Sequence, residues 1–349
     1  MKLIQNQLIK TNVINLRKYK ENTQAKKSLV LNILIKGFVV IFLAAMIIFP
    51  SASYEGATGG LLLWFHNVLP NLLPFIILSN LMIQLNITSK ISSFFYPVLG
   101  RLFQVSKEGC YPIIIGFLSG IPMGAKSTAD LVSEGKISRS EGNFLITMCN
   151  NASPMFIIGY IAISQLKLPR IKYALFVIIY SSAIISALLC RYLYHKVIRR
   201  NKEAYSIKDS SCLDRKKKGT SHFSFEILDH SIMNGFEVIT KIGGYIILFS
   251  IIAQIVKEIG SDTNIFKIIF MGIVEITTGI NQISMGLLNR KIKIVLVAVL
   301  TSFGGLSGIA QTKSVLGSTR LSIKYYIIVK LISIVITYLL ASIYVNLIL

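Results

Sequence analysis

Six apolar stretches of roughly 20 residues with few charges constrain the fold more than any other feature of the chain. Because a helix rises about 1.5 Å per residue, about 20 apolar residues cross a hydrocarbon core. With 53% hydrophobic and 15% charged residues, a soluble globule would lack polar sequence to cover its surface. The chain is therefore predicted to be an all-α polytopic membrane protein. The stretches are Leu29 to Phe49, Leu69 to Leu85, Tyr173 to Tyr194, Ile242 to Val256, Ile294 to Ile309 and Tyr325 to Leu347.

The formal net charge of +22 is concentrated in two places. Residues 1–28 hold seven Lys/Arg against one Glu, and residues 191–218 hold ten against three acidic residues. Both flank apolar stretches, which is the bias of cytoplasmic segments in membrane proteins. No aromatic interleaving or recognition motif accompanies these charges, so the expected partner is the lipid bilayer and not a nucleic acid. A basic cluster within residues 167–172 does not fit this topology.

The charge pattern divides the chain into four parts. A basic cytoplasmic segment, residues 1–28, precedes a first membrane half, residues 29–194. A basic cytoplasmic loop, residues 195–226, precedes a second half, residues 227–349. Each half has an intact apolar helix, two interrupted segments and a closing helix, an order typical of transporters built from two inverted repeats.

The first interrupted segment is residues 112–129, PIIIGFLSGIPMGAKSTA. Glycine loosens the backbone and proline removes a hydrogen-bond donor, so Gly120, Pro122 and Gly124 cannot sustain a straight helix here. The apolar arms on either side are too short to span a membrane. We therefore expect a re-entrant hairpin with its tip near residues 120–124.

The second interrupted segment is residues 144–158, FLITMCNNASPMFII. Pro154 clashes with the carbonyl group of Asn150 and disfavours helical angles at Ser153, so the helix is predicted to break over Asn150, Asn151, Ala152 and Ser153. The break leaves two amide side chains and free backbone groups facing something polar.

The second half repeats this arrangement. Residues 268–288 carry a carboxylate, two hydroxyls and an amide in apolar sequence, and residues 302–312 read SFGGLSGIAQT. The latter segment is predicted to unwind at its glycines and Ser307. The polar residues of the first segment are Glu275, Thr277, Thr278 and Asn281; the glycines of the second are Gly304, Gly305 and Gly308.

Two motifs carry a family resemblance. They are Gly120-Ile121-Pro122-Met123-Gly124-Ala125-Lys126 and Cys149-Asn150-Asn151-Ala152-Ser153-Pro154, with Leu63-Trp64 and Leu69-Pro70-Asn71-Leu72-Leu73-Pro74-Phe75 upstream. With them, residues 35–347 resemble the sporulation integral membrane protein YlbJ family of the nucleoside-recognition, or Gate, superfamily.

The resemblance implies an architecture similar to concentrative nucleoside transporters and movement of dipicolinic acid from the mother cell across the outer forespore membrane. In the nucleoside carriers, two hairpin tips and two unwound helices surround the substrate. Glu275 matches the glutamate of their second hairpin. The glutamate of their first hairpin has no counterpart here, where Pro122, Met123, Gly124 and Lys126 stand instead, and this departure favours an anion over a nucleoside.

Two charged residues have competing interpretations. Lys126 either offsets the charge of a carboxylate substrate beside helix N-termini or pairs with Asp130 at helical i, i+4 spacing. Glu275 is either a coupling site for a proton or sodium ion, because a buried carboxylate is costly unless it faces a partner or cavity, or it is paired structurally with another helix.

The uncharged polar residues also have competing interpretations. Asn150, Asn151 and Ser153 either contact substrate or a cation, or hold helices together. Thr277 and Thr278 are predicted to contact substrate. Ser307, Gln311 and Thr312 either do the same or serve only close packing beside the glycines.

No catalytic or metal-ligand spacing is present among the Cys, His and acidic residues, and no phosphate loop is present, so neither an enzyme nor a cofactor is predicted. The leading hypothesis is a carrier for a small aromatic dicarboxylate in a membrane of a spore-forming bacterium, as a monomer or homo-oligomer. Two alternatives are a nucleoside or metabolite carrier of the same fold and a non-transporting factor for spore-cortex assembly.

Overall fold

The computed structural model describes residues 33–85, 87–200, 223–259 and 265–347. The basic segment 1–28 and most of the predicted cytoplasmic loop 195–226, namely residues 201–222, lie outside the described residues. The ends of that loop, residues 195–200 and 225–226, belong to the helices on either side. The chain divides into two compact units at residue 53. In the first unit the described part is a helix from Ile33 to Ile48, followed by the start of α2 (Pro50–Leu63). The Ser53 hydroxyl there donates to the Phe49 carbonyl over 2.8 Å.

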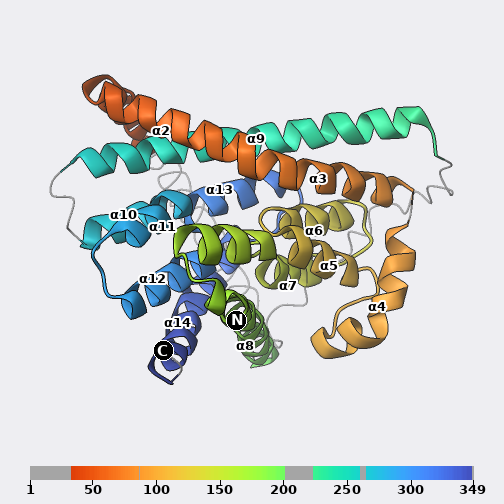
Figure 1. The fold of residues 1–349 in the computed structure, drawn as a ribbon. Helices are drawn as coiled ribbons and strands as arrows, with labels where there is room; N and C mark the ends of the chain where they lie inside the picture. The colour runs from red at the N-terminus through yellow and green to blue at the C-terminus, as the bar shows by residue number, and fades with distance from the viewer. Residues whose placement is uncertain (1–32, 86, 201–222, 260–264, 348–349) are drawn as a thin grey trace, which may run out of the picture. The chain divides into compact units, whose positions relative to one another are not determined.

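The second unit is built of helices, and its described residues contain no strand (Figure 1). Over all described residues of the chain, including those of the first unit, four helical stretches are long and apolar enough to cross a membrane, or up to six if each of two bent helix pairs counts as one span. This confirms the all-α polytopic membrane fold. The elements of the first half are α2 (Pro50–Leu63), η1 (Trp64–Val68), α3 (Leu69–Gln84), α4 (Thr88–Phe103), α5 (Cys110–Ser119), α6 (Met123–Ser133), α7 (Arg139–Cys149), η2 (Phe156–Gln165), η3 (Pro169–Ile171) and α8 (Lys172–Arg200).

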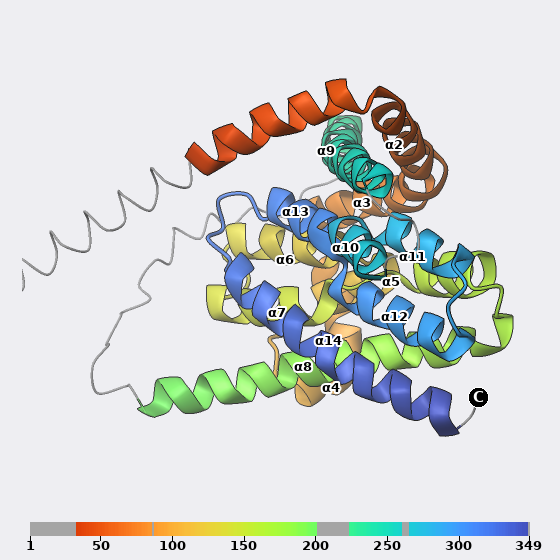
Figure 2. The ribbon, with the colours of Figure 1, turned by 90° about the vertical axis from the view of Figure 1, so that its left-hand side faces the viewer.

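The second half repeats the order of hairpin, broken helix and closing helix. Its hairpin is α10 with α11, its broken helix is α12 with α13, and its closing helix is α14, which packs against α12 and α8 (Figure 2). The elements are α9 (Phe225–Glu258), α10 (Ile265–Val274), α11 (Ile276–Met285), α12 (Arg290–Phe303), α13 (Gly305–Val315) and α14 (Ile323–Leu347).

Helix α14 shows how this fold inverts the polarity of a soluble protein. Its exposed side includes Leu331, Val335 and Leu339, spaced four residues apart and suited to contact lipid. Its buried side carries Ser333 and Thr337, whose hydroxyls meet the Ser182 hydroxyl of α8 at 3.3 and 2.6 Å. Such small polar contacts hold helices together where lipid removes the hydrophobic drive for association.

The first hairpin is confirmed. Helices α5 and α6 are 10 and 11 residues long, too short to span a membrane, and residues 120–122 turn the chain between them. Gly120 has φ +79°, and a Cβ there would lie 2.5 Å from the backbone nitrogen of Ser153. Glycine is thus required both by the turn and by close approach of the next broken helix.

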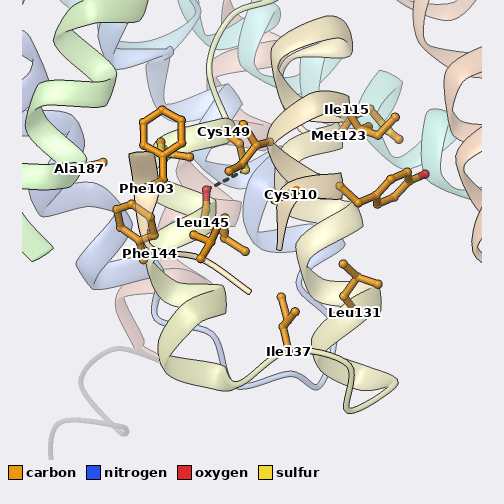
Figure 3. Packing of buried hydrophobic residues seen from close by; sticks show 14 of the residues in the cluster. Phe103, Cys110, Ile115, Met123, Leu131, Ile137, Phe144, Leu145, Cys149 and Ala187 are labelled. Atoms are coloured by element: carbon orange, nitrogen blue, oxygen red, sulfur yellow. Dashed lines mark hydrogen bonds between the residues drawn. The ribbon is translucent and has the colours of Figure 1, made fainter. Parts of the chain in front are cut away.

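The packing that positions this hairpin is apolar. Side chains of α5, α6 and α7 belong to one buried cluster, which also includes Phe103 from α4, Ala187 from α8 and residues of α3 and α9 (Figure 3). The Cys149 thiol donates to the Leu145 carbonyl over 2.7 Å at the end of α7, the bond drawn in Figure 3.

Both breaks in the long helices form, but not to the same extent. After α7 the chain leaves helical geometry over residues 150–153 and resumes at Pro154, as predicted. The predicted unwinding over residues 304–308 was wrong in extent: only Gly304 and Gly305 have left-handed backbone angles, with φ +83° and +71°, and Ser307 and Gly308 lie within α13. A glycine costs only about 1 kcal/mol inside a helix, and the packing of α13 against α9 and α10 outweighs that cost.

Candidate functional site

A cavity of about 390 Å³ lies where the two hairpin tips and the two helix breaks meet. Each of these four features contributes residues to its wall, and η1, α3, η2 and α9 close it. The chain breaks predicted from sequence therefore converge on one site. The contributing residues are Ser119 and Ile121 from the first hairpin, Ala152 and Ser153 from the first break, Glu275, Ile276 and Thr277 from the second hairpin, and Gly304, Ser307 and Gly308 from the second break.

Glu275 is the one charged residue among the described residues that line this cavity. It stands between α10 and α11 with extended backbone angles and is 2% exposed. Its Oε2 accepts hydrogen bonds from the Thr278 amide at 2.8 Å, from the Thr278 hydroxyl at 3.2 Å, and from the Thr277 hydroxyl. The carboxylate thus caps the first turn of α11 while forming part of the cavity wall.

The N-terminus of α13 differs from those of α6 and α11. Asn150 Oδ1 accepts from the Ala125 amide of α6 at 3.3 Å, and Glu275 caps α11, whereas Gly304 offers α13 no side-chain cap. Gly304, Ser307 and Gly308 all face the cavity. Uncapped amides at a helix N-terminus favour a negatively charged group, so this wall is suited to an anionic oxygen.

An aromatic pair forms another part of the wall. Phe156 and Tyr160 of η2 both line the cavity, and their rings stack with centroids 5.0 Å apart and planes 20° from parallel. Neither residue was singled out from the sequence, because aromatic residues in an apolar helix are common and only the fold shows which of them face a cavity.

Five of the predicted site residues line the cavity: Ser153, Glu275, Thr277, Ser307 and Gln311. Gln311 donates to the Ser307 hydroxyl over 3.1 Å, so the two side chains are joined at the wall. Thr278 instead lines a neighbouring cavity of about 440 Å³, which shares Thr277 and Tyr160 with the first.

Lys126 does not line either cavity. Its amine forms an ion pair with Asp130, 2.7 Å from both carboxylate oxygens, with the two side chains 12% and 25% exposed. The structure thus contains the i, i+4 pair that was the alternative interpretation of this lysine.

Asn150 lies behind the cavity wall and bridges three elements. Its Nδ2 donates to the Thr312 hydroxyl of α13 at 2.8 Å and to the Tyr326 hydroxyl of α14 at 3.1 Å, while Oδ1 accepts from α6. Both polar atoms of its side chain are engaged by protein, so in this state Asn150 joins helices.

Asn151 has a partner that sequence reasoning missed. Its Oδ1 accepts a hydrogen bond at 2.7 Å from the amine of Lys330, which is 2% exposed in α14. The signal was present in the sequence: a single lysine stands within the otherwise apolar stretch Tyr325 to Leu347. A cation inside a membrane segment marks a functional position by default.

The chain is 28% identical over 338 residues to the sporulation integral membrane protein YlbJ of Bacillus subtilis (strain 168), with 86% of this chain and 79% of that protein covered. No family model and no solved structure matches the chain. The extent of the similarity confirms the resemblance carried by the hairpin and break motifs. The chain is thus similar, over most of its length, to a sporulation integral membrane protein.

Proposed function

We propose that the chain is a membrane carrier for a small aromatic dicarboxylate and that its substrate in sporulation is dipicolinic acid, moved from the mother cell toward the forespore. The membrane is then the mother-cell or outer forespore membrane. The protein then acts as a carrier and not as an enzyme.

The observation that carries the proposal is the convergence of four chain interruptions on one cavity. Backbone that leaves helical geometry inside a membrane is tolerated only where it is buried in protein or lines a cavity. Discontinuous helices meeting at such a cavity form the substrate sites of many secondary transporters, in which one repeat moves against the other to expose the site alternately to each side.

Two features of the wall support a planar aromatic anion. The stacked rings of Phe156 and Tyr160 offer an apolar face for an aromatic ring. The uncapped N-terminus of α13 offers backbone amides to a carboxylate. The cavity, about 390 Å³, falls within the range of about 300–1,000 Å³ of small-molecule sites.

Glu275 makes binding of a dicarboxylate depend on a cation that binds with it. Two carboxylates about 4 Å apart repel each other by about 4 kcal/mol at an effective dielectric constant of about 20, so a dicarboxylate beside an ionised Glu275 needs a compensating cation. A proton or sodium ion bound with the substrate would supply it, and its gradient would then drive transport.

The same carboxylate favours a second candidate, a nucleoside carrier. A nucleoside is neutral, and its sugar hydroxyls can donate hydrogen bonds to Glu275 without any added cation. Dipicolinate binding therefore requires a cation or proton to neutralise Glu275, whereas uridine binding requires no added cation.

Titration of the purified protein with dipicolinate and with uridine, each in sodium chloride and in choline chloride at two pH values, tests the assignment. We expect saturable binding of dipicolinate, strengthened by lower pH or by sodium, and no binding of uridine. Binding of uridine alone would establish the second candidate, and binding of neither would favour an assembly factor without a transport role.

A further inference from the structure

The amine of Lys330 lies at the junction of the two broken helices. It donates to Asn151 Oδ1, in the first break, over 2.7 Å and to the carbonyl oxygen of Ser302, the second-last residue of α12, over 3.2 Å. Helix carbonyls at that position lack an intrahelical partner. Both acceptors are therefore oxygens that the breaks themselves make available.

The site is built for the amine. Asn151 Nδ2 donates to the Met148 carbonyl over 2.7 Å, which fixes the amide with Oδ1 toward Lys330. The ring of Tyr326 lies with its centroid 5.5 Å from the Lys330 amine. Two oxygens and an aromatic face thus meet the three N–H groups of an ammonium ion.

No acidic partner accompanies this cation. Among the described residues Lys330 forms no ion pair, in contrast to Lys126, which pairs with Asp130. An ammonium held only by an amide oxygen, a carbonyl oxygen and an aromatic face has the surroundings in which a monovalent cation such as sodium or ammonium binds to proteins.

The same contacts reach the first hairpin. The backbone oxygen of Asn151 accepts from the Ile121 amide at the hairpin tip over 2.7 Å. Lys330 thereby joins α14 to both breaks directly and, through Asn151, to the hairpin tip. Ile121, Ala152 and Gly304, which neighbour these contacts, line the cavity.

We propose that Lys330 is a tethered cation that occupies a monovalent-cation site between the two broken helices and holds the cavity wall in its binding-competent form. The chain then needs no dissolved cation at this junction, and any coupling ion acts elsewhere, at Glu275. The effect on transport rests on the proposed function, whereas the existence of the cation site does not.

Chemical rescue tests the site. Lys330→Ala removes the amine and opens a void, whereas Lys330→Met removes the charge and keeps the void filled. In detergent, we expect methylammonium chloride, compared with choline chloride at equal ionic strength, to raise the unfolding midpoint of Lys330→Ala by about 2–4 °C once the cation exceeds its dissociation constant several-fold. Lys330→Met and the unsubstituted protein should show no such cation-specific rise.

An equal response of Lys330→Ala and Lys330→Met, or no response of a folded Lys330→Ala protein, would overturn the proposal. If Lys330→Ala yields no folded protein even when prepared in methylammonium, a Glu275→Gln protein that retains Lys330 gives the deciding measurement. Its midpoint should be the same in sodium chloride and choline chloride, because its own amine fills the junction, and a sodium-specific rise would contradict the proposal.

Substrate uptake is a separate readout. In liposomes, the Lys330→Ala protein should take up dipicolinate roughly tenfold more slowly than the unsubstituted protein. Methylammonium should restore the uptake rate of Lys330→Ala but not that of Lys330→Met. Absence of uptake by every protein, with rescue of stability intact, would reject dipicolinate transport and leave the tethered cation standing.

Discussion

Lys330 and Asn151, 179 positions apart in the sequence, are joined by a 2.7 Å hydrogen bond that links the closing helix α14 to the break after α7. Both side chains are buried, at 2% exposure each. The contact sits directly behind the wall of the cavity, so its removal should affect stability and substrate binding together.

Lys330→Met is predicted to destabilise the protein by about 1–3 kcal/mol for each oxygen left without a donor, namely Asn151 Oδ1 and the Ser302 carbonyl oxygen. The double variant Lys330→Met, Asn151→Leu should recover part of that loss, because it removes one of the orphaned acceptors. Unfolding in detergent measures both, with Lys241→Met as control. That substitution breaks the exposed i, i+4 pair with Glu237 on α9 and should cost less than about 1 kcal/mol. Equal losses for Lys330→Met and Lys241→Met would show that the buried contact contributes no more to stability than an exposed ion pair.

Glu275→Gln is predicted to retain binding of dipicolinate but to lose accumulation against a gradient, since an amide keeps the shape of the side chain and cannot exchange a proton or balance a cation. Equilibrium binding and uptake into liposomes with an imposed proton or sodium gradient measure the two properties. Glu237→Gln, which alters an exposed carboxylate on α9, is the matched control and should transport normally. If the Glu275→Gln protein accumulated dipicolinate normally, the role of Glu275 would be limited to capping α11.

Tyr160→Leu is predicted to weaken dipicolinate binding roughly twofold to tenfold, because it removes one ring of the stacked pair on the cavity wall. An aliphatic dicarboxylate such as glutarate should bind the variant and the unsubstituted protein alike. Tyr338→Leu, which changes an exposed tyrosine of α14, serves as the control. The aromatic assignment fails if both dicarboxylates lose affinity equally.

Gly120→Ala is predicted to disrupt the first hairpin more than Gly135→Ala. Both glycines have positive φ, +79° and +67°, so both substitutions carry the same kind of backbone strain. A Cβ at Gly120 meets the backbone of Ser153, whereas one at Gly135 meets nothing within 4 Å. Comparing the two unfolding midpoints isolates the close approach between hairpin and break, and a Gly120→Ala midpoint at or above that of Gly135→Ala would contradict it.

Local chemistry made the interruptions of the fold predictable. Pro154 removes a donor and clashes with the preceding turn, and Gly120 and Pro122 cannot continue a helix, so the first break and first hairpin followed from covalent structure alone. The extent of the second break did not, because Gly308 is compatible with a helix once α13 is packed against its neighbours, so that only Gly304 and Gly305 leave helical geometry.

The partners of the polar residues depend on tertiary packing and could not be read in the same way. Nothing local distinguishes Asn150, which bridges α6, α13 and α14, from Ser153, which lines the cavity. Lys126 pairs with Asp130, one helical turn away, and this is the partner that i, i+4 spacing in the sequence predicts. Lys330 donates hydrogen bonds to oxygens in α12 and in the first break, both of which are far from it in the sequence.

Uptake of labelled dipicolinate into liposomes that contain the purified protein tests the carrier assignment most directly. We predict saturable uptake that exceeds protein-free liposomes, is stimulated by an inward proton or sodium gradient, and is inhibited by excess unlabelled dipicolinate but not by uridine. Uptake no faster than in protein-free liposomes under every gradient, by protein shown to be folded, would contradict the account.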